Sequence, residues 1–434
     1  MDLSRRQLLG AAGALALPAA LAGCGGFSTS GGSSGGASGG GDALTFTTWG
    51  TDAELAGLRS AVSRFEESSG ATVSLNVVPY EQMFSNIDAQ IQAGNPPDVF
   101  RVPYYTFGSY AGAGQLLDLS SYLGSDVADR FTDQAWAAVQ NEGSPFGVPH
   151  HTDTSAILFN RPMLEAAGIT DVPTRLEDAW SWDDLAQVAT TLRAALPDDQ
   201  YPFAYNWQGN GVTRWLSWLF QADGRFLTED LSGPAIDSDA GRAAVEFTQS
   251  FFSQGWVPPN DTISSSTYAQ DTWYSQTVPL VWSGAFSIPD AEATLDFEWG
   301  ATFAPQRVRG GSDFGGNALV ATAGTANPEL AAALLASVTE EESMREFCTG
   351  ASLLPTRTDL VEQGIEFDVR PELAPVFLGQ ASTVRPQDSA QVASPDMAAI
   401  ITVLQDQLED AFVGGQDAAT TVRSLSDGIS DAVR

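Results

Sequence analysis

Residues 143–168 read GSPFGVPHHTDTSAILFNRPMLEAAG and set the expected fold. The stretch begins with an extended segment at 146–149 and continues through a polar turn at 150–154. An apolar strand at 156–159 follows, and then a helix that stops before Gly168. A chain that leaves one globular half and enters another needs such a crossing. We therefore expect two halves, with polar side chains at the crossing facing whatever lies between them.

The chain before this crossing alternates strand and helix patterns. Strand patterns occupy 44–50, 71–79 and 96–100, and helix patterns occupy 54–69 and the residues from 80 onward. This order predicts an α/β fold with a mostly parallel, doubly wound sheet, in which ligands bind beyond the carboxyl ends of the strands. Five side chains just after predicted strand ends are therefore candidates for ligand contact: Trp49, Tyr80, Glu81, Tyr104 and Tyr105. If Tyr104 and Tyr105 are extended, they cannot both face the ligand.

Charge and length exclude some kinds of protein. The 434 residues are sufficient for two domains, and the formal net charge is −34. All 20 basic residues are arginines. Nucleic acids and anionic membranes are bound by clustered positive charge, so we expect neither as the ligand.

The first 41 residues are typical of a targeting sequence. Arg5 and Arg6 precede an apolar stretch that ends in Leu-Ala-Gly-Cys, which predicts a signal peptide over 1–24 and a lipid anchor on Cys24. The paired arginines favour twin-arginine export, with an ordinary Sec signal as the alternative. Residues 25–41 are a Gly/Ser tether, so we expect the protein at the outer face of the cell membrane. Cys348 is then left without a partner, and we expect it to be a buried small hydrophobe.

Several segments resemble motifs of the maltose-binding type of bacterial extracellular solute-binding proteins (family 1), and they occur in the family's order. Besides the crossing, they are GNPPDV at 94–99, AGAGQLLDL at 111–119, WSWDDL at 180–185, QADGRF at 221–226, AAVEFTQSFFSQG at 243–255, TVPLVWSGAF at 277–286, FGGNALV at 314–320 and LLPTR at 353–357. The segment at 277–286 lacks the Gly-Lys pair of the family pattern. The resemblance extends from residue 44 to at least residue 360.

The resemblance implies a two-lobed periplasmic-binding-protein type II fold, with a mostly parallel sheet flanked by helices in each lobe and a ligand cleft between them. Lobe 1 would comprise about 42–153 and 313–356, and lobe 2 about 154–312 and 357–434. The implied function is capture of a sugar or oligosaccharide for a membrane permease of an ABC importer, by a monomer without a cofactor. A non-sugar solute such as a peptide, or a sensory glycan-binding role, are the alternatives.

Sugar hydroxyls need hydrogen-bond partners, and sugar C–H faces lie well on aromatic rings. We therefore assign a polar clamp and a set of stacking rings, with further candidates at the two crossings. The clamp is Glu81, Asp153, Asn317 and Arg357; the rings are Trp49, Tyr80, Tyr104, Tyr105, Trp207, Trp282 and Phe286; the crossings add His151 and Gly316.

Some of these candidates have a structural alternative. Trp207 lies in a Gly-rich polar loop and could be plain surface. Asp153 could cap its own turn, and Arg357 could pair with an acid. Trp215 and Trp218 fall on one helix face and are expected in the core.

Enzymatic interpretations find little support in the residues. His150 and His151 with Asp153 resemble a metal cluster, but adjacent residues of a strand point to opposite faces and the chain has no other histidine. A phosphate-binding loop needs a lysine, and nucleophile-elbow spacing is missing. We therefore expect a binding protein without catalytic residues or metal.

Overall fold

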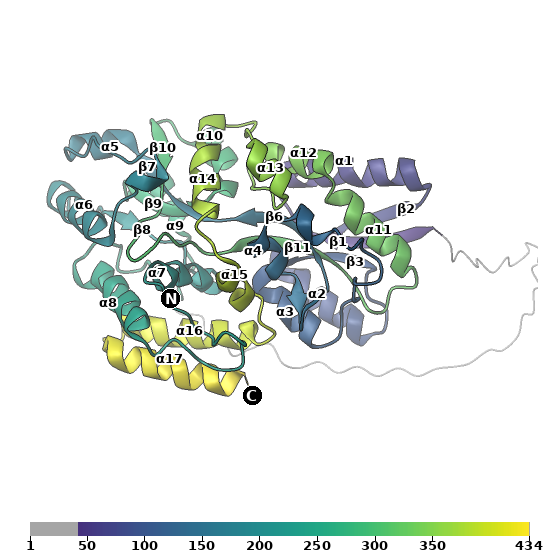
Figure 1. The fold of residues 1–434 in the computed structure, drawn as a ribbon. Helices are drawn as coiled ribbons and strands as arrows, with labels where there is room; N and C mark the ends of the chain where they lie inside the picture. Colours follow the sequence, from purple (N-terminus) through teal and green to yellow (C-terminus); the bar gives the residue numbers. More distant parts are fainter. Residues whose placement is uncertain (1–41, 434) are drawn as a thin grey trace, which may run out of the picture. The chain divides into compact units, whose positions relative to one another are not determined.

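The computed structural model describes residues 42–433 (Figure 1). The expected signal peptide, the lipid anchor on Cys24 and the tether lie outside the described residues. Within the described residues, no helix combines the length and the apolar character needed to cross a membrane. These residues belong to one compact unit that spans Gly40–Arg434.

Five strands form the first sheet, in the order β2-β1-β3-β11-β6. β1 is parallel to β2 and β3, whereas β11 is antiparallel to both β3 and β6. β11 therefore runs against the other four strands of this sheet. The strands are β1 (Ala43–Thr48), β2 (Thr72–Val77), β3 (Val99–Pro103), β6 (Val148–Asp153) and β11 (Gly315–Ala321).

Apolar side chains alternate between the two faces of this sheet. Val99 of β3 and Leu319 of β11 join one core cluster, and Phe100 of β3 and Ala318 of β11 join another. Both faces are covered by helices, which is why these strands are apolar on both sides. The helices on this side of the molecule are α1 (Asp52–Ser69), α2 (Tyr80–Gln92), α3 (Tyr104–Gly112), α4 (Asp133–Ala137), α11 (Pro328–Val338), α12 (Glu341–Ala351) and α13 (Thr358–Gln363).

The second sheet has four strands in the order β10-β7-β9-β8. β7 is antiparallel to β10 and β9, and β8 is parallel to β9. One strand again opposes the others, so both sheets have mixed pairings, and the expected α/β fold with sheets flanked by helices is confirmed. The strands are β7 (Ser155–Asn160), β8 (Phe203–Ala204), β9 (Leu280–Gly284) and β10 (Trp299–Thr302).

A large aromatic core lies beside this second sheet. The expected core tryptophans Trp215 and Trp218 are both fully buried there, which confirms the prediction. The helices around this sheet and its core are α5 (Arg161–Ala166), α6 (Trp182–Ala195), α7 (Leu216–Gln221), α8 (Asp239–Ser253), α9 (Ala269–Tyr274), α10 (Ile288–Thr294), α14 (Ala374–Ala381), α16 (Met397–Phe412) and α17 (Ala418–Ala432). A short helix, α15 (Pro386–Val392), instead packs on α4, and the strands β4 (Gln140–Asn141) and β5 (Ser144–Pro145) form a small hairpin.

The first crossing is nearly continuous strand. β6 ends at Asp153 and β7 begins at Ser155, so a single buried residue, Thr154, separates the two sheets (Figure 1). The chain returns between β10 and β11. A third segment lies beside the first crossing, because Leu354 exchanges backbone hydrogen bonds of 2.9 and 3.2 Å with Thr152.

Three local predictions were wrong. Residues 150–153 of the expected polar turn belong to β6, because the backbone of this segment pairs with β11. His150 and His151 do not point to opposite faces, since their rings lie 5.4 Å apart and both pack against Phe347. Tyr104 and Tyr105 open helix α3 instead of extending β3. Elsewhere the predicted elements are confirmed, including the capping box of Ser181 and Asp184 at the start of α6 and the buried Cys348.

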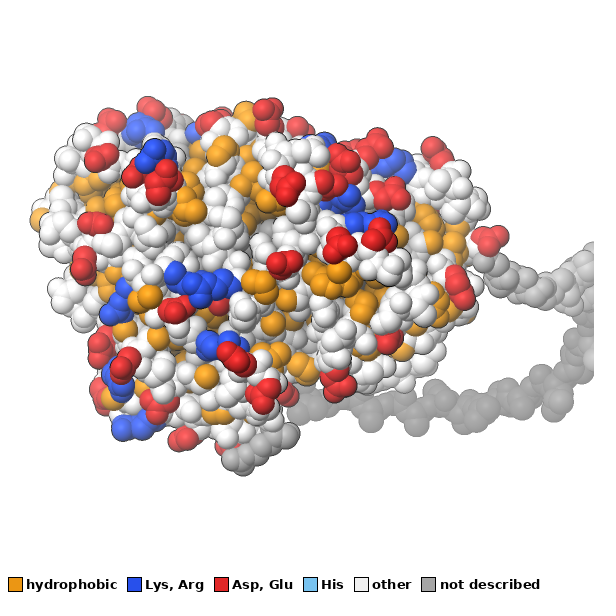
Figure 2. Space-filling view, in the orientation of Figure 1, with side chains coloured by type: hydrophobic (Ala, Val, Ile, Leu, Met, Phe, Trp, Pro, Cys, Tyr) orange, Lys and Arg blue, Asp and Glu red, His pale blue; other side chains and the backbone are white. Residues whose placement is uncertain are grey.

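On the face drawn in Figure 2, red carboxylate side chains are spread over the surface and blue guanidinium groups lie among them. This distribution matches the net charge of −34.

Candidate functional site

Three aromatic residues meet where the strands of the first sheet end. The ring of Trp49, which follows β1, lies 5.3 Å from the ring of Tyr80 at the start of α2. The hydroxyl of Tyr80 is hydrogen-bonded to that of Tyr105 on α3. Tyr80 is 37% exposed, and Trp49 and Tyr105 are half-buried. These three sequence-predicted candidates are therefore neighbours, and they present rings and hydroxyls that solvent can partly reach.

A buried arginine holds Trp49 in place. Arg101, in the middle of β3, is 2% exposed. Its Nη2 lies 2.6 Å from Oε1 of Glu54 on α1, and its Nη1 donates to the backbone oxygen of Trp49 at 2.9 Å. Its guanidinium also lies over the Trp49 ring, 4.6 Å from the centroid. Burial would raise the pKa of Glu54, but the charge and hydrogen bonds of Arg101 hold that pKa below its usual value.

His151 and Asn317 extend this network along the β6–β11 pair. Nε2 of His151 lies 3.3 Å from Nη2 of Arg101 and 3.1 Å from Nδ2 of Asn317. Burial and the nearby Arg101 hold the pKa of His151 well below its ordinary value, so the ring is neutral. The next residue toward the crossing, Gly316, has φ +94°, and a Cβ there would lie 2.4 Å from the oxygen of His151. Only glycine fits at this position.

Asp153 is the buried carboxyl at the end of β6. Its Oδ2 is 3.9 Å from Arg214, and Arg214 is also 3.9 Å from Oδ2 of Asp313. Burial raises the pKa of Asp153 to about 7; the charges of Asp313 and Glu54 add to this, whereas Arg214 and the backbone N–H of Ala285 oppose it. The Asp153–Arg214–Asp313 cluster thus holds two buried acids around one guanidinium.

Residues of the second half contact this cluster. The backbone of Gly284, at the end of β9, approaches so closely that a Cβ there would lie 2.2 Å from Oδ1 of Asp153. Oδ1 of Asp313 accepts from the backbone N–H of Ser155 at 3.1 Å, and the N–H of Asp313 donates to Oγ of Ser217 at 2.8 Å. Both acids, one at each crossing, therefore contact residues of the second half.

Arg214 also links the cluster to the aromatic group. It belongs to a 3₁₀ helix, η3 (Gly209–Trp215), on the side of the second sheet. Its charge acts on the hydroxyls of Tyr80 and Tyr105, and the side chain of Asn210 is within hydrogen-bonding reach of both. Residues positioned by the two sheets thus converge on one region, which we take as the candidate site.

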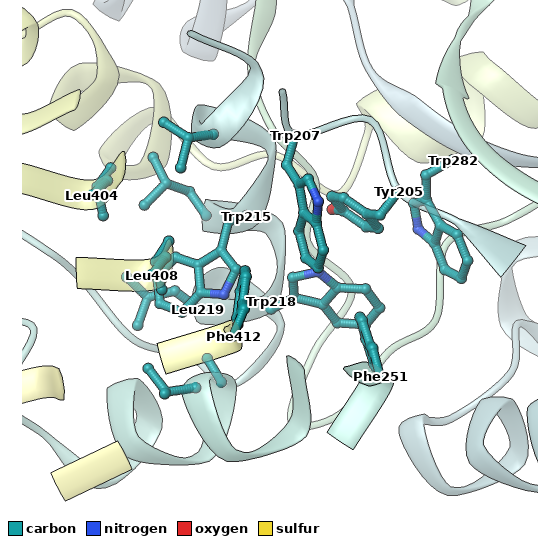
Figure 3. Packing of buried hydrophobic residues seen from close by; sticks show 14 of the residues in the cluster. Tyr205, Trp207, Trp215, Trp218, Leu219, Phe251, Trp282, Leu404, Leu408 and Phe412 are labelled. Carbon is teal, nitrogen blue, oxygen red and sulfur yellow. The ribbon is translucent and has the colours of Figure 1, made fainter. Parts of the chain in front are cut away.

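Three predicted stacking residues lie elsewhere, and we withdraw them. Tyr104, Trp207 and Trp282 are at most 1% exposed. Tyr104 faces the interior of the first half and donates to the oxygen of His151 at 3.1 Å. Trp207 and Trp282 belong to the aromatic core, on either side of Tyr205 with ring centroids 4.7 and 5.4 Å away (Figure 3). The Trp207 ring is buried because Phe251, Phe252 and Phe412 pack against it, and its indole N–H donates to the oxygen of Asp261 at 2.9 Å.

The remaining candidates have weaker links to the site. Glu81 is exposed at the start of α2. Arg357 pairs with Asp359 at 2.6 Å, the alternative that the sequence left open. Phe286 is half-buried just after β9.

Sequence reasoning missed Glu54, Arg101, Arg214 and Asp313. One signal was available: Arg101 interrupts the apolar strand VFRVP, and a charge in a buried strand needs a buried partner.

Two surface hollows in the described part of the chain lie away from this region. One, of about 460 Å³, is lined by Trp182, Phe247 and Arg307 among others. The other, of about 340 Å³, is lined by residues that include Thr47 and Asn76. Neither includes a member of the network above, so the site rests on converging buried polar groups and not on surface shape.

Comparison with known proteins identifies the family of this chain. A model of the bacterial extracellular solute-binding protein family matches residues 49–345, more than half of the 434 residues. This chain belongs to that family. The family comprises extracellular solute-binding proteins, so this solute-binding protein is extracytoplasmic.

Individual relatives of this solute-binding protein are distant. A putative binding protein of Brucella abortus (strain 2308) is 24% identical over 137 residues, which are 32% of either chain. The maltotriose-binding protein of Pyrococcus abyssi (strain GE5 / Orsay) is 23% identical over 226 residues, or 52% of this chain and 45% of that protein. The chain thus spans about a third to a half of the length of these curated relatives.

The fold likeness is more complete. The crystal structure of the cyclic α-maltosyl-1,6-maltose binding protein from Arthrobacter globiformis superimposes with a TM-score of 0.75 at 17% identity. It covers 91% of this chain and 99% of that chain. The expected two-lobed periplasmic-binding-protein type II fold is therefore confirmed.

The carboxyl of Asp153 gives the solute-binding protein a pH-dependent stability. Burial raises its pKa to about 7 in the fold from an ordinary value of 3.8, so its stabilising contribution is full below about pH 4 and is lost as the pH rises through 7. For Asp153→Asn, we expect the unfolding free energy of wild type relative to the variant to fall as the pH rises from 4 to 8, by up to about 4 kcal/mol, because the variant has no carboxyl to ionise. Urea denaturation at each pH measures this difference. A flat difference contradicts the prediction, and Asp126→Asn, at an exposed pair, is the matched control.

Proposed function

We propose that this protein is the carbohydrate-binding component of an ABC importer, which captures a sugar or oligosaccharide and delivers it to a membrane permease. The observation that carries the proposal is one network that joins partly exposed rings, Trp49 and Tyr80, to buried polar atoms without partners. Oδ1 of Asp153 and Oδ1 of Asn317 have no hydrogen-bond partner among the described residues. A sugar matches such a network, because its C–H faces lie on rings and its hydroxyls donate to oxygens.

The comparisons support this ligand class. Two of the proteins above are named for maltotriose and for a cyclic maltosyl-maltose, both oligosaccharides. We extend that class to this chain as a proposal, together with its place in an importer. The protein acts by binding, and the chemistry of the transport step belongs to its partners.

In this proposal, the two lobes capture the ligand by closing around it. The hinge lies at Thr154 and at the return crossing, which supports lobe boundaries near 153/154 and 312/313. The third expected boundary, near 356/357, has less support, because α13 just after it packs on α12 of the first side. The ligand drives closure only by its greater affinity for the closed state, in which both lobes contact it. Arg214 and Asn210 from one lobe, and Tyr80 and Asp153 from the other, are placed to make those contacts.

The proposal also covers location and assembly. Residues 1–24 act as a lipoprotein signal peptide, with twin-arginine or Sec export, and Cys24 carries the lipid. Residues 25–41 tether the solute-binding domain to the membrane, where a monomer docks on the permease. Support comes from the sequence alone: Arg5 and Arg6, the Leu-Ala-Gly-Cys motif, and the Gly/Ser composition.

Thermal denaturation tests the ligand class. The compact unit Gly40–Arg434 is melted with mono- and oligosaccharides, and with amino acids and short peptides as controls. A sugar at a hundred times its dissociation constant should stabilise the fold by about 2.7 kcal/mol, which raises the melting temperature. Tyr80→Ala should weaken that shift, whereas Tyr122→Ala, at a half-buried ring that packs on a core cluster without site residues, is the control. Stabilisation by peptides alone, or by none of these compounds, rejects the sugar assignment.

A further inference from the structure

We propose that the saccharide bound here carries a protonated amine, and that this ammonium group is held by Asp153. The inference rests on the proposed function, because it names the class of sugar that the same site selects. Its basis is the charge and the hydrogen-bonding state of the Asp153–Arg214–Asp313 cluster.

The cluster carries one uncompensated negative charge. Arg101 and Glu54, the neighbouring pair, are 2.6 Å apart and neutralise each other. Arg214 is the remaining guanidinium, and it must serve both Asp153 and Asp313 from 3.9 Å, which is beyond hydrogen-bond distance. A buried charge without a partner is costly, so the site favours a ligand that brings a positive charge.

The unpaired atoms are acceptors. Oδ1 of Asp153 and Oδ1 of Asn317 lack a hydrogen-bond partner among the described residues, and their side chains are 7% and 8% exposed. Both belong to the β6–β11 pair, in which Asn317 pairs with His151 and Gly315 pairs with Asp153. An ammonium group has three donors and no acceptor, so it suits two unpaired oxygens better than a hydroxyl does.

The other polar groups near Asp153 do not offer an unpaired acceptor for the ammonium group. Asp313 already accepts from the backbone N–H of Ser155 at 3.1 Å. His151 is neutral, with a pKa well below its ordinary value, and its Nε2 is occupied by Arg101 and Asn317. The described residues contain no group of three or more His, Cys, Asp or Glu side chains that could hold a metal ion.

In the protein without ligand, the Asp153 carboxyl can bind a proton in place of the ammonium group. Asp153 is faced by Arg214 of η3, by Asp313 of the return crossing and by Glu54 of α1, and its pKa is about 7. The free carboxyl is therefore partly protonated near neutral pH. An ammonium ligand displaces this proton, because the carboxylate and the cation stabilise each other.

Matched disaccharides test the inference. The β-1,4-linked disaccharide of glucosamine is compared by calorimetry at pH 7 with its N,N′-diacetyl form and with the β-1,4-linked disaccharide of glucose. We expect the free amine to bind roughly 10- to 100-fold more tightly than either neutral sugar, the range for a hydrogen bond to a charged group. Asp153→Asn should lower the affinity for the amine sugar far more than the affinity for either neutral sugar, so that the preference is lost. Glu165→Gln, at an exposed acid of α5, removes the same charge elsewhere and should keep the preference.

A second measurement uses the unaltered protein, in case the Asp153→Asn variant fails to fold. The affinity for the amine sugar should rise between pH 5 and pH 7 as Asp153 ionises, while that for the N-acetylated sugar should not follow it. Tighter binding of a neutral sugar, or an amine preference that survives Asp153→Asn, overturns the inference and leaves the proposed function intact. If none of the three disaccharides binds, the inference is rejected; only failure of the whole sugar panel rejects the proposed function as well.

Discussion

Replacing Arg101 by methionine is expected to lower the free energy of unfolding by about 3–5 kcal/mol, the usual result of breaking a buried ion pair from one side. The loss has three parts. The carboxylate of Glu54, with a side chain 14% exposed, is left without its cation. The backbone oxygen of Trp49 loses a donor at 2.9 Å, and Nε2 of His151 loses its contact at 3.3 Å. Urea denaturation followed by tryptophan fluorescence measures the change.

Two further variants make this result specific. Arg101→Met combined with Glu54→Gln should recover part of the loss, because the second change removes the stranded charge. Arg130→Met breaks an exposed pair with Asp126, whose side chains are 47% and 65% exposed, and should leave stability nearly unchanged. A wild-type unfolding curve for Arg101→Met alone would show that the pair contributes nothing.

Trp282→Ala should be comparably destabilising, by about 3–5 kcal/mol, because it empties a space in the aromatic core. The ring is 1% exposed, and its centroid lies 5.2 Å from that of Phe203 and 5.8 Å from that of Trp218. Thermal and urea denaturation of the variant without ligand measure the effect. Loss of ligand binding in this variant therefore reports a damaged fold and not a lost stacking contact.

Tyr80→Ala is the contrasting variant. The Tyr80 ring is 37% exposed at the candidate site, so its removal should change ligand affinity far more than stability. Equal stability of Trp282→Ala and Tyr80→Ala in the absence of ligand would contradict the separation between core and site drawn here.

Local sequence patterns predicted the elements of the fold well. Gly70 ends α1 with φ +75°, and Ser181 begins α6 with a capping box. Both residues act on the backbone only a few positions away in the sequence. The prediction of a polar turn at 150–154 was wrong because these polar residues pair with a strand that is far away in the sequence. His151 and Asp153 lie in a strand whose partners come from β11, more than 160 residues away.

The site was only partly predictable for the same reason. Trp49, Tyr80 and Tyr105 follow strand ends, and the topology of parallel sheets places such residues together. Trp207 sits in a loop of polar and glycine residues, but Phe412 of α16 stacks on it at 4.8 Å. Nothing near Trp207 in the sequence indicates that contact. Arg214 lies between core residues Val212 and Trp215, and its role depends on acids at both crossings.

The short connection between β6 and β7 determines how far a rotation at the crossing moves the far end of either strand. With Thr154 alone between two six-residue strands, no slack separates the two sheets. A six-residue strand is a stiff lever about 20 Å long at roughly 3.3 Å per residue. Turning it by about 10° through the backbone torsions of Thr154 displaces its far end by about 3 Å, a distance comparable to the length of one hydrogen bond. A small rotation at the crossing therefore becomes a movement of several ångströms at the far end of each strand.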